Sequence, residues 1–183
     1  MALTYSSMLE LGSCLEEFKL LNTVSGNDFS SSELDEAKPS LIMFICNHCP
    51  YVIHYHDEIK RLANDFDDTI NMVAISSNDI KEYPQDGPDK MRELWAELGL
   101  SFPYLFDSTQ DVAKQYKAEC TPEFYLFDSS HKLVYRGRLD ESSPNSGSEP
   151  TGKDLRNAIE NMLNNEEVNP DQFPSMGCNI KWK

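Results

Sequence analysis

Apolar residues along the chain gather in short runs that alternate with amphipathic stretches. The run Leu-Ile-Met-Phe-Ile at 41–45 is typical of a strand that is buried on both faces of a sheet. Residues 70–76 form a second run of this kind. Between the two runs, apolar side chains from Val52 to Phe66 recur at helical spacing, and Pro50 suits a first turn because its missing N–H is not needed there. The pattern therefore predicts a strand, a helix and a strand in that order.

The rest of the chain continues this alternation. The further predicted elements are a hairpin over 18–29 with a turn at 25–28, a polar loop over 77–88, a helix over 89–98 closed by Gly99, a strand over 102–106, a short helix over 111–116, a hairpin that pairs 124–127 with 133–135, and a last helix from 151 to about 164. Alternating strands and helices indicate one α/β domain over residues 1–165.

Residues 166–183 have a different composition from the domain. Pro170, Pro174 and Gly177 cannot continue a helix, yet Cys178, Ile180 and Trp182 alternate with polar residues. We therefore expect an extended tail that packs on the domain.

Composition limits the possible partners and compartments. A chain of 183 residues with 39% hydrophobic residues can bury a real core, and its net charge of −15 argues against nucleic acid or an anionic membrane as a partner. The sequence has no basic residue before Lys19 and no apolar run that approaches 18 residues. We therefore expect a cytoplasmic protein in which the five cysteines are free or catalytic rather than part of a disulfide scaffold.

The segment Cys46-Asn47-His48-Cys49 lies between the first predicted strand and the following helix. Thiols at a helix N-terminus ionise readily, and two cysteines separated by two residues can close a disulfide ring. We expect Cys46, as the more exposed sulfur, to attack a substrate disulfide as the thiolate and Cys49 to resolve the mixed disulfide. His48 lies between the sulfurs, can stabilise the thiolate and would make the couple more oxidising.

Two other uses of these cysteines remain open. In one, Cys46, Cys49 and one or two of Cys120 and Cys178 bind zinc in a non-catalytic module, although the chain has no second Cys-x-x-Cys and no His-x-x-x-His.

The other is a thiol peroxidase. Peroxiredoxins carry Pro-x-x-x-Thr/Ser-x-x-Cys, and placing the reactive cysteine at Cys49 puts Cys46 and Ile42 in the other two slots. The arginine that such a site needs has only Arg136 and Arg138 as candidates. Dithiol chemistry therefore ranks above direct peroxide reduction.

The order of elements and several motifs resemble a known family. The segment Phe44-Ile45-Cys46-Asn47-His48-Cys49-Pro50-Tyr51-Val52 and the tail 174–183 resemble the peroxiredoxin-like, AhpC/TSA-related redoxins. The resemblance implies a thioredoxin-like α/β fold with a central mixed β-sheet flanked by helices, an N-terminal β-hairpin and a C-terminal extension. It also implies that Thr121-Pro122 is a cis peptide facing the dithiol, with the Thr121 backbone open to an extended substrate chain.

These observations together predict a thiol:disulfide oxidoreductase that needs no cofactor beyond its cysteines. Its partners would be a disulfide-containing protein or small-molecule disulfide, with peroxide as the alternative substrate, and a cellular thiol reductant. A further hypothesis concerns the tail, which would bring Cys178 within disulfide range of Cys120 and form a second redox pair that relays oxidation from Cys46 and Cys49, leaving Cys14 unpaired.

Overall fold

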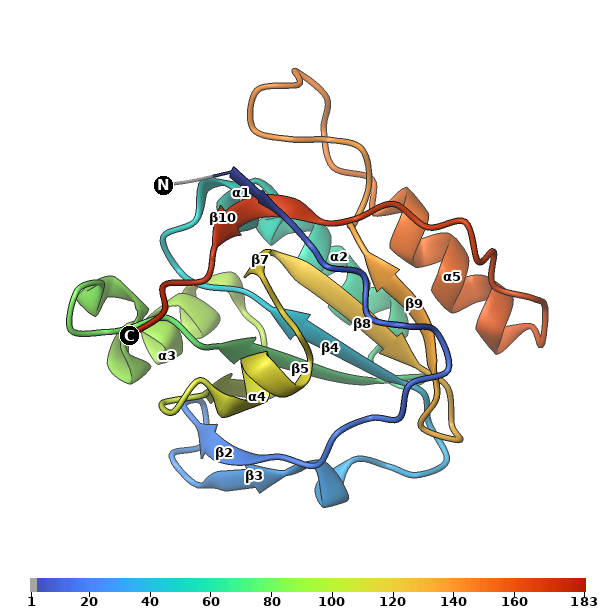
Figure 1. The fold of residues 1–183 in the computed structure, drawn as a ribbon. Coiled ribbons are helices and arrows are strands. Elements are labelled where there is room, and N and C mark those ends of the chain that lie inside the picture. The colour runs from blue at the N-terminus through green and yellow to red at the C-terminus, as the bar shows by residue number, and fades with distance from the viewer. Residues whose placement is uncertain (1–2) are drawn as a thin grey trace.

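Strand β4 (Ser40–Phe44) lies in the middle of a mixed sheet in the computed structural model, which describes residues 3–183 (Figure 1). Its side chains are all buried and alternate between two hydrophobic cores. Leu41 and Met43 belong to one core, and Ile42 and Phe44 to the other. Both faces of the sheet are therefore covered, as the continuous apolar run predicts.

The main sheet has seven strands in the order β3-β2-β6-β5-β4-β8-β9. Strands β4, β5 and β6 are parallel neighbours, and the remaining pairs are antiparallel. The other strands of this sheet are β2 (Lys19–Asn22), β3 (Asp28–Ser30), β5 (Asn71–Ser76), β6 (Tyr104–Phe106), β8 (Glu123–Phe127) and β9 (Leu133–Gly137). The predicted thioredoxin-like α/β fold with an N-terminal hairpin is confirmed.

The helices cover the two faces unequally. Residues of α2, α3 and α5 belong to the core on one face, whereas α4 contributes to the core on the other. The helices are α1 (Pro50–His54), α2 (His56–Phe66), α3 (Pro88–Leu98), α4 (Asp111–Gln115) and α5 (Lys153–Leu163), with short 3-10 turns η1 (Ser31–Glu33) and η2 (Pro84–Asp86). None of the helices in residues 3–183 has the length and apolarity needed to cross a membrane.

The single helix expected from Pro50 to Phe66 is divided at Tyr55. Tyr55 has φ −95° and ψ 0°, and its N–H bonds to the carbonyl of Val52, three residues back. The buried Tyr55 ring directs its hydroxyl to the carbonyl oxygen of Ser142 at 2.8 Å. The periodic pattern did not reveal this break because Tyr55 contributes an apolar ring in helical register.

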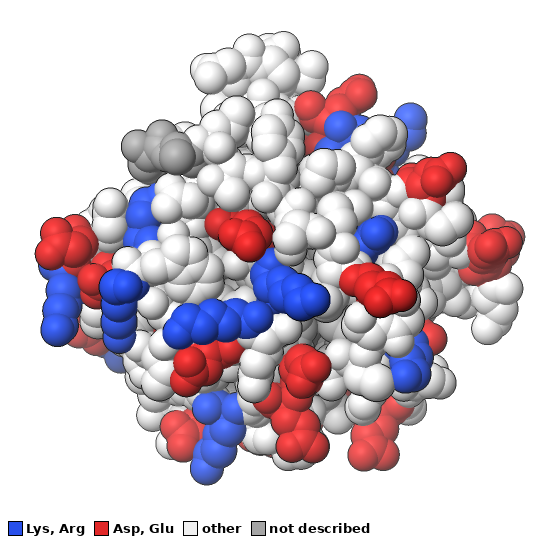
Figure 2. Space-filling view, in the orientation of Figure 1, with Lys and Arg blue, Asp and Glu red and all other residues white. Residues whose placement is uncertain are grey.

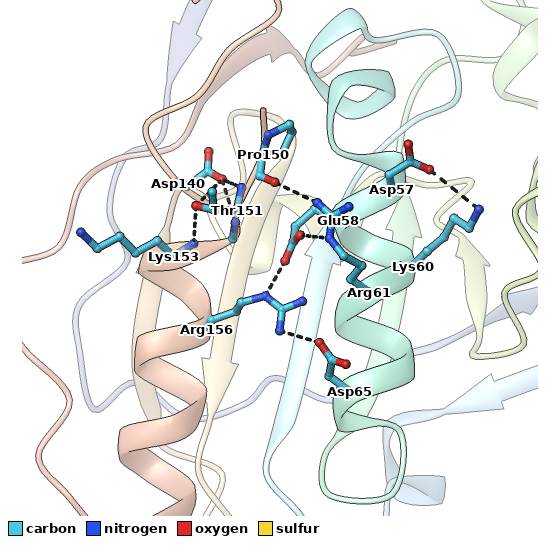
Figure 3. A network of polar contacts seen from close by, with 11 residues as sticks. Asp57, Glu58, Lys60, Arg61, Asp65, Asp140, Pro150, Thr151, Lys153 and Arg156 are labelled. Atoms are coloured by element: carbon cyan, nitrogen blue, oxygen red, sulfur yellow. Dashed lines mark hydrogen bonds and ion pairs between the residues drawn. The ribbon is translucent and has the colours of Figure 1, made fainter. Parts of the chain in front are cut away.

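Helices α2 and α5 are joined by the polar network in Figure 3. Glu58, with 1% of its side chain exposed, accepts hydrogen bonds from Arg61 and Arg156, and Arg156 also reaches Asp65 at 2.7 Å. Gly152 has φ +65°, and a Cβ there would lie 2.4 Å from Glu58 Oε1, so only glycine fits beside the buried carboxylate. Such pairing is what makes a buried charge tolerable.

A second, small sheet joins the two ends of the described chain. Strand β10 (Met176–Asn179) pairs antiparallel with β1 (Leu3–Tyr5) on one side and with β7 (Cys120–Thr121) on the other. In Figure 1, β1 and β10 run side by side next to α1. The tail is thus ordered against the domain, as an inner strand rather than a loose extension.

Charges of both signs are interspersed over the face of the molecule in Figure 2. Basic side chains there alternate with acidic ones and form no continuous basic surface.

Candidate active site

The two cysteines of the motif lie where β4 ends and α1 begins. Cys49 occupies the N-cap position of α1, and Pro50 follows in the first turn. The exposed fractions are 1% for Cys46 and 0% for Cys49. Both thiols are therefore covered, and exposure does not distinguish Cys46 from Cys49 as the sulfur that a substrate would reach.

Thr121 and Pro122 face this dithiol. The Thr121–Pro122 peptide is cis, which confirms the prediction. The Cys49 thiol donates to the carbonyl oxygen of Thr121 at 3.2 Å, and the Thr121 hydroxyl lies 3.4 Å from Cys46 Sγ. The Thr121 backbone is not open to a substrate chain, however, because Cys178 of β10 is its ladder partner.

Asp86 is the main site residue that the sequence analysis did not identify. It is 0% exposed and accepts hydrogen bonds from the Asn47 backbone N–H at 2.9 Å and from Asn78 Nδ2 at 2.8 Å. Its other contact is His48 Nδ1 at 2.6 Å. The polar loop after β5 carries Asp86, and β5 runs parallel to β4, so the loop reaches the same sheet edge as the cysteines. That adjacency is the only sequence signal that points to it.

His48 lies between this carboxylate and an aromatic ring. Its imidazole stacks on Tyr83 with 5.2 Å between ring centroids and 10° between planes. One ring nitrogen lies within 4.8 Å of Cys46 Sγ. His48 is therefore close enough to influence the dithiol electrostatically, and its effect on the redox potential stays a prediction.

The negative charge of the reduced site is best placed on Cys49. A hydrogen bond from the Cys46 thiol, then bonds from Cys178, the Val52 backbone N–H and the Thr121 hydroxyl, lower the pKa of Cys49 to about 5, although burial opposes the shift. The same Cys46–Cys49 hydrogen bond, followed by burial and the Asp86 carboxylate, raises the pKa of Cys46 well above its usual value. When Cys49 ionises, it loses the proton that it donates to the Thr121 carbonyl oxygen, so that hydrogen bond exists only in the neutral form.

This distribution is the opposite of the one expected from the sequence. Cys49 is the N-cap of α1, and the backbone N–H of Val52, the third residue after it, is among the groups that lower the pKa of Cys49. Cys46 lies before the helix and experiences Asp86 instead. The helix-terminus argument is sound, but it applies to Cys49.

Cys178 joins the dithiol, and Cys120 does not. Cys178 forms a side-chain hydrogen bond with Cys49. Cys120 precedes Thr121 in β7, so its side chain is on the opposite face of the strand, where its sulfur lies 3.8 Å from Glu123 Oε2. The structure therefore does not support the expected pairing of Cys120 with Cys178, and no disulfide joins any cysteines within residues 3–183.

A metal could be held by a different group of residues from the one expected. Cys46 Sγ, a His48 nitrogen and an Asp86 oxygen lie within 4.8 Å of one another. Ligand atoms around zinc are about 3.5 Å apart, so this group would have to contract, and His48 and Asp86 already bond each other. Cys120 is directed away from this group.

The two arginines considered for a peroxide site bond elsewhere. Arg136 donates to the Leu9 carbonyl at 2.7 Å and to Gln172 at 2.8 Å. Arg138 pairs with Asp154 at 2.6 Å. The hydrogen bonds of Arg136 thus fix the N-terminal and C-terminal segments to the domain, and Arg138 fixes α5.

Comparison with known proteins agrees with this architecture. A model of the family described as Redoxin matches residues 10–155. The chain belongs to the Redoxin family. Two solved structures resemble this redoxin over nearly its whole length. An uncharacterized conserved protein of Geobacillus kaustophilus is 47% identical, with 100% of this chain and 97% of the other covered and a TM-score of 0.97.

The second structure is a hypothetical protein of Sinorhizobium meliloti 1021, 38% identical over 98% of both chains, with a TM-score of 0.95. Among curated proteins, thiol-disulfide oxidoreductase YkuV of Bacillus subtilis (strain 168) is 24% identical over 110 residues, which are 58% of this redoxin and 70% of YkuV. The similarity to YkuV links this redoxin to a protein named for dithiol chemistry, whereas the two structural neighbours carry no named activity.

Proposed function

We propose that this redoxin is a thiol:disulfide oxidoreductase whose redox couple is Cys46 and Cys49. The observation that carries the proposal is the approach of both sulfurs to Thr121 beside the cis Thr121–Pro122 peptide, at 3.4 Å for Cys46 and 3.2 Å for Cys49. The neighbouring Cys46 thiol lowers the pKa of Cys49 to about 5. A thiolate beside a protonated thiol is the arrangement that disulfide exchange requires. The name of the YkuV relative supports the same class of reaction.

In the proposed reaction the Cys49 thiolate attacks one sulfur of a substrate disulfide and releases the other as a thiolate. Cys46 then attacks the Cys49 sulfur of the mixed disulfide, and its proton passes to the released substrate thiol. The products are a Cys46–Cys49 disulfide and a fully reduced substrate. A cellular thiol would return the protein to the dithiol form.

The residues around the couple have supporting roles in this proposal. Asp86 anchors the turn by accepting the Asn47 N–H and bonding His48, which fixes the approach to Cys46. The cis Pro122 positions the Thr121 carbonyl and hydroxyl against the two sulfurs. Because both sulfurs are buried, a small disulfide is a better substrate than a folded protein unless β10 moves.

A thiol peroxidase is the second candidate. The observation that favours it is the location of the stabilised thiolate at Cys49, the slot that a peroxide-reducing cysteine would occupy. Hydrogen peroxide is also small enough to approach a covered sulfur. Against it, the threonine or serine slot holds Cys46 and the candidate arginines bond elsewhere.

Steady-state assays separate these functions. Reduction of oxidised glutathione and of hydrogen peroxide is measured with the wild-type protein, C46S and C49S, and C14S serves as a matched control because Cys14 is exposed and distant in sequence. We expect disulfide turnover that C49S loses, that is lowered in C46S and that C14S keeps. Full disulfide activity in C46S and C49S would contradict the proposal, and faster turnover of peroxide would favour the second candidate.

Metal analysis tests the remaining class. About one tightly bound zinc per chain in protein purified without added metal would indicate a zinc module built on Cys46, Cys49 and neighbouring ligands. We expect substoichiometric zinc, with all thiols of the denatured protein free to react.

A further inference from the structure

Cys178 comes from a strand far from the Cys-x-x-Cys motif in sequence. In the β7–β10 ladder it lies directly opposite Thr121. Thr121 in turn touches both active-site sulfurs, through its carbonyl to Cys49 and through its hydroxyl to Cys46. Cys178, Cys46 and Cys49 all belong to the same hydrophobic core.

The contact between Cys178 and Cys49 has a defined direction. Cys178 is the proton donor of the shared hydrogen bond, because the bond favours the charged form of Cys49 and the neutral form of Cys178. Cys46 makes a bond of the same kind to the same sulfur. Cys49 is thus approached by two protonated thiols, one from its own turn and one from the tail.

The register of β10 fixes this contact. Gly177 packs so closely on β7 that an added Cβ would lie 2.0 Å from the Thr121 carbonyl oxygen and 3.3 Å from Pro122 Cδ. Strand β1 holds the other edge of β10 by pairing Leu3 with Cys178. With neighbours on both edges, β10 cannot slip by a residue without turning Cys178 away from Cys49.

We propose that Cys178 is a third redox-active thiol, which resolves Cys49 by forming a Cys49–Cys178 disulfide. The proposal rests on the proposed function in that Cys49 is taken as the sulfur that receives the substrate. Cys178 would therefore act as a second catalytic residue of the dithiol reaction, with Cys46 as its competitor.

The Cys49–Cys178 disulfide can form by either of two thiol–disulfide exchange reactions, and atoms and electrons balance in both. From a mixed disulfide, the Cys178 sulfur attacks Cys49, the bond from Cys49 to the substrate sulfur breaks, and the Cys178 proton passes to the departing substrate thiolate. From the Cys46–Cys49 disulfide, the same attack releases Cys46 as a thiol and moves the disulfide to the tail without net oxidation. Oxidising equivalents enter only from the substrate disulfide.

The experiment looks for a disulfide between Cys49 and Cys178 in protein that lacks Cys46. Reduced C46S protein is refolded from urea in a glutathione redox buffer, so that the oxidant reaches thiols that are buried in the folded state. Remaining thiols are alkylated, and tryptic peptides are mapped without reduction. Cleavage after lysine and arginine, except before Pro39, puts Cys49 in peptide 20–60, Cys120 in 118–132 and Cys178 in 157–181, so each possible link has its own mass.

We expect the link between peptides 20–60 and 157–181 to exceed the link between 20–60 and 118–132 by more than about tenfold, because only Cys178 has a high effective concentration at Cys49. C46S/C120S should keep this product, and C46S/C178S should retain glutathione on Cys49 instead. Wild-type protein oxidised with less than one equivalent is mapped alongside, and the 49–178 link is expected there as well.

The results distinguish failure of the proposed role of Cys178 from failure of the proposed function. A persistent glutathione adduct on Cys49 with Cys178 fully alkylated, or equal amounts of the 49–120 and 49–178 links, would overturn the role of Cys178. If wild-type protein turns over disulfides while C46S forms no 49–178 link, the inference is wrong and the proposed function stands. If the 49–178 link forms but wild-type protein has no disulfide activity, the proposed function is wrong and the third-thiol arrangement stands.

Discussion

Replacing Gly177 by alanine is expected to lift β10 off the dithiol. The added Cβ would meet the Thr121 carbonyl oxygen at 2.0 Å, its carbonyl carbon at 2.8 Å and Pro122 Cδ at 3.3 Å. These atoms belong to the backbone or to a proline ring, so no flexible side chain can move aside. The strand itself must shift, and Cys178 moves with it.

The cost follows from the contacts that are lost. Overpacking of this kind destabilises a protein by about 1–3 kcal/mol, and each ladder hydrogen bond that breaks adds about 0.5–1.5 kcal/mol. In a chain of this size each kcal/mol lowers Tm by about 2–4 °C, so we expect a decrease of about 5–10 °C. Cys178, now 5% exposed, should at the same time become accessible to alkylation.

The assay combines thermal unfolding of the reduced protein with iodoacetamide labelling well below Tm, read by mass spectrometry for each cysteine. Gly147→Ala is the control, because a Cβ there meets nothing within 4 Å although φ is +70°. Its backbone cost is about 1 kcal/mol, and it should leave Cys178 protected. A Gly177→Ala protein with unchanged Tm and a protected Cys178 would refute the close packing of β10 on Thr121 and Pro122.

Three further predictions concern individual side chains. The thiolate absorbance of the reduced protein should titrate below pH 7 and disappear in C49S. Because the pKa of Cys49 is lowered on folding, stability in urea should rise as the pH increases from about 5 toward the unfolded thiol pKa of about 8.5, and C49S should lose this slope. Asp86→Asn should lower the free energy of unfolding in urea by about 1–3 kcal/mol, because a buried carboxylate that accepts several hydrogen bonds is lost. It should also lower the pKa of Cys46, which titration of C49S/D86N against C49S measures. In native alkylation time courses, the exposed Cys14 should react first and Cys120, whose pKa is raised by burial, last; the reverse order would contradict the described burial.

Local pattern was sufficient for most of the fold. The apolar runs at 41–45 and 70–76 correspond to β4 and β5, and the Gly99 helix end is present with Gly99 in the left-handed conformation. These elements are specified by side chains close together in sequence, so their periodicity is readable. The position of the dithiol at the end of β4 followed directly from them.

The site was less predictable because long-range pairing completes it. Strands β7 and β10 have two and four residues, too few for a periodic signal, and their contact joins segments far apart in sequence. The tail was therefore expected to be extended, but its partner was misassigned to Cys120. A strand pair places opposed residues on the same face, so knowing the register would have selected Thr121 and, through it, Cys49.

Asp86 illustrates a second limit. In sequence it is one acidic residue in a polar loop of a chain that has many, and only the position of that loop after β5 separates it from the other carboxylates. Only the fold shows that it is fully buried under the active-site turn. The electrostatics of the two thiols depend on this residue and on which cysteine is the helix N-cap, and neither is encoded in the motif alone.

The dependence of the small sheet on β10 has a consequence during biosynthesis. The dithiol and the Thr121-Pro122 segment emerge from the ribosome before residues 176–179. A nascent chain that ends short of β10 therefore presents its reactive cysteines with the Thr121 ladder edge unfilled. Strand β10, which is made after the other described strands, then covers the site, and chains stalled or cleaved before residue 176 should exchange with low-molecular-weight disulfides to form mixed disulfides far more readily than chains that contain β10.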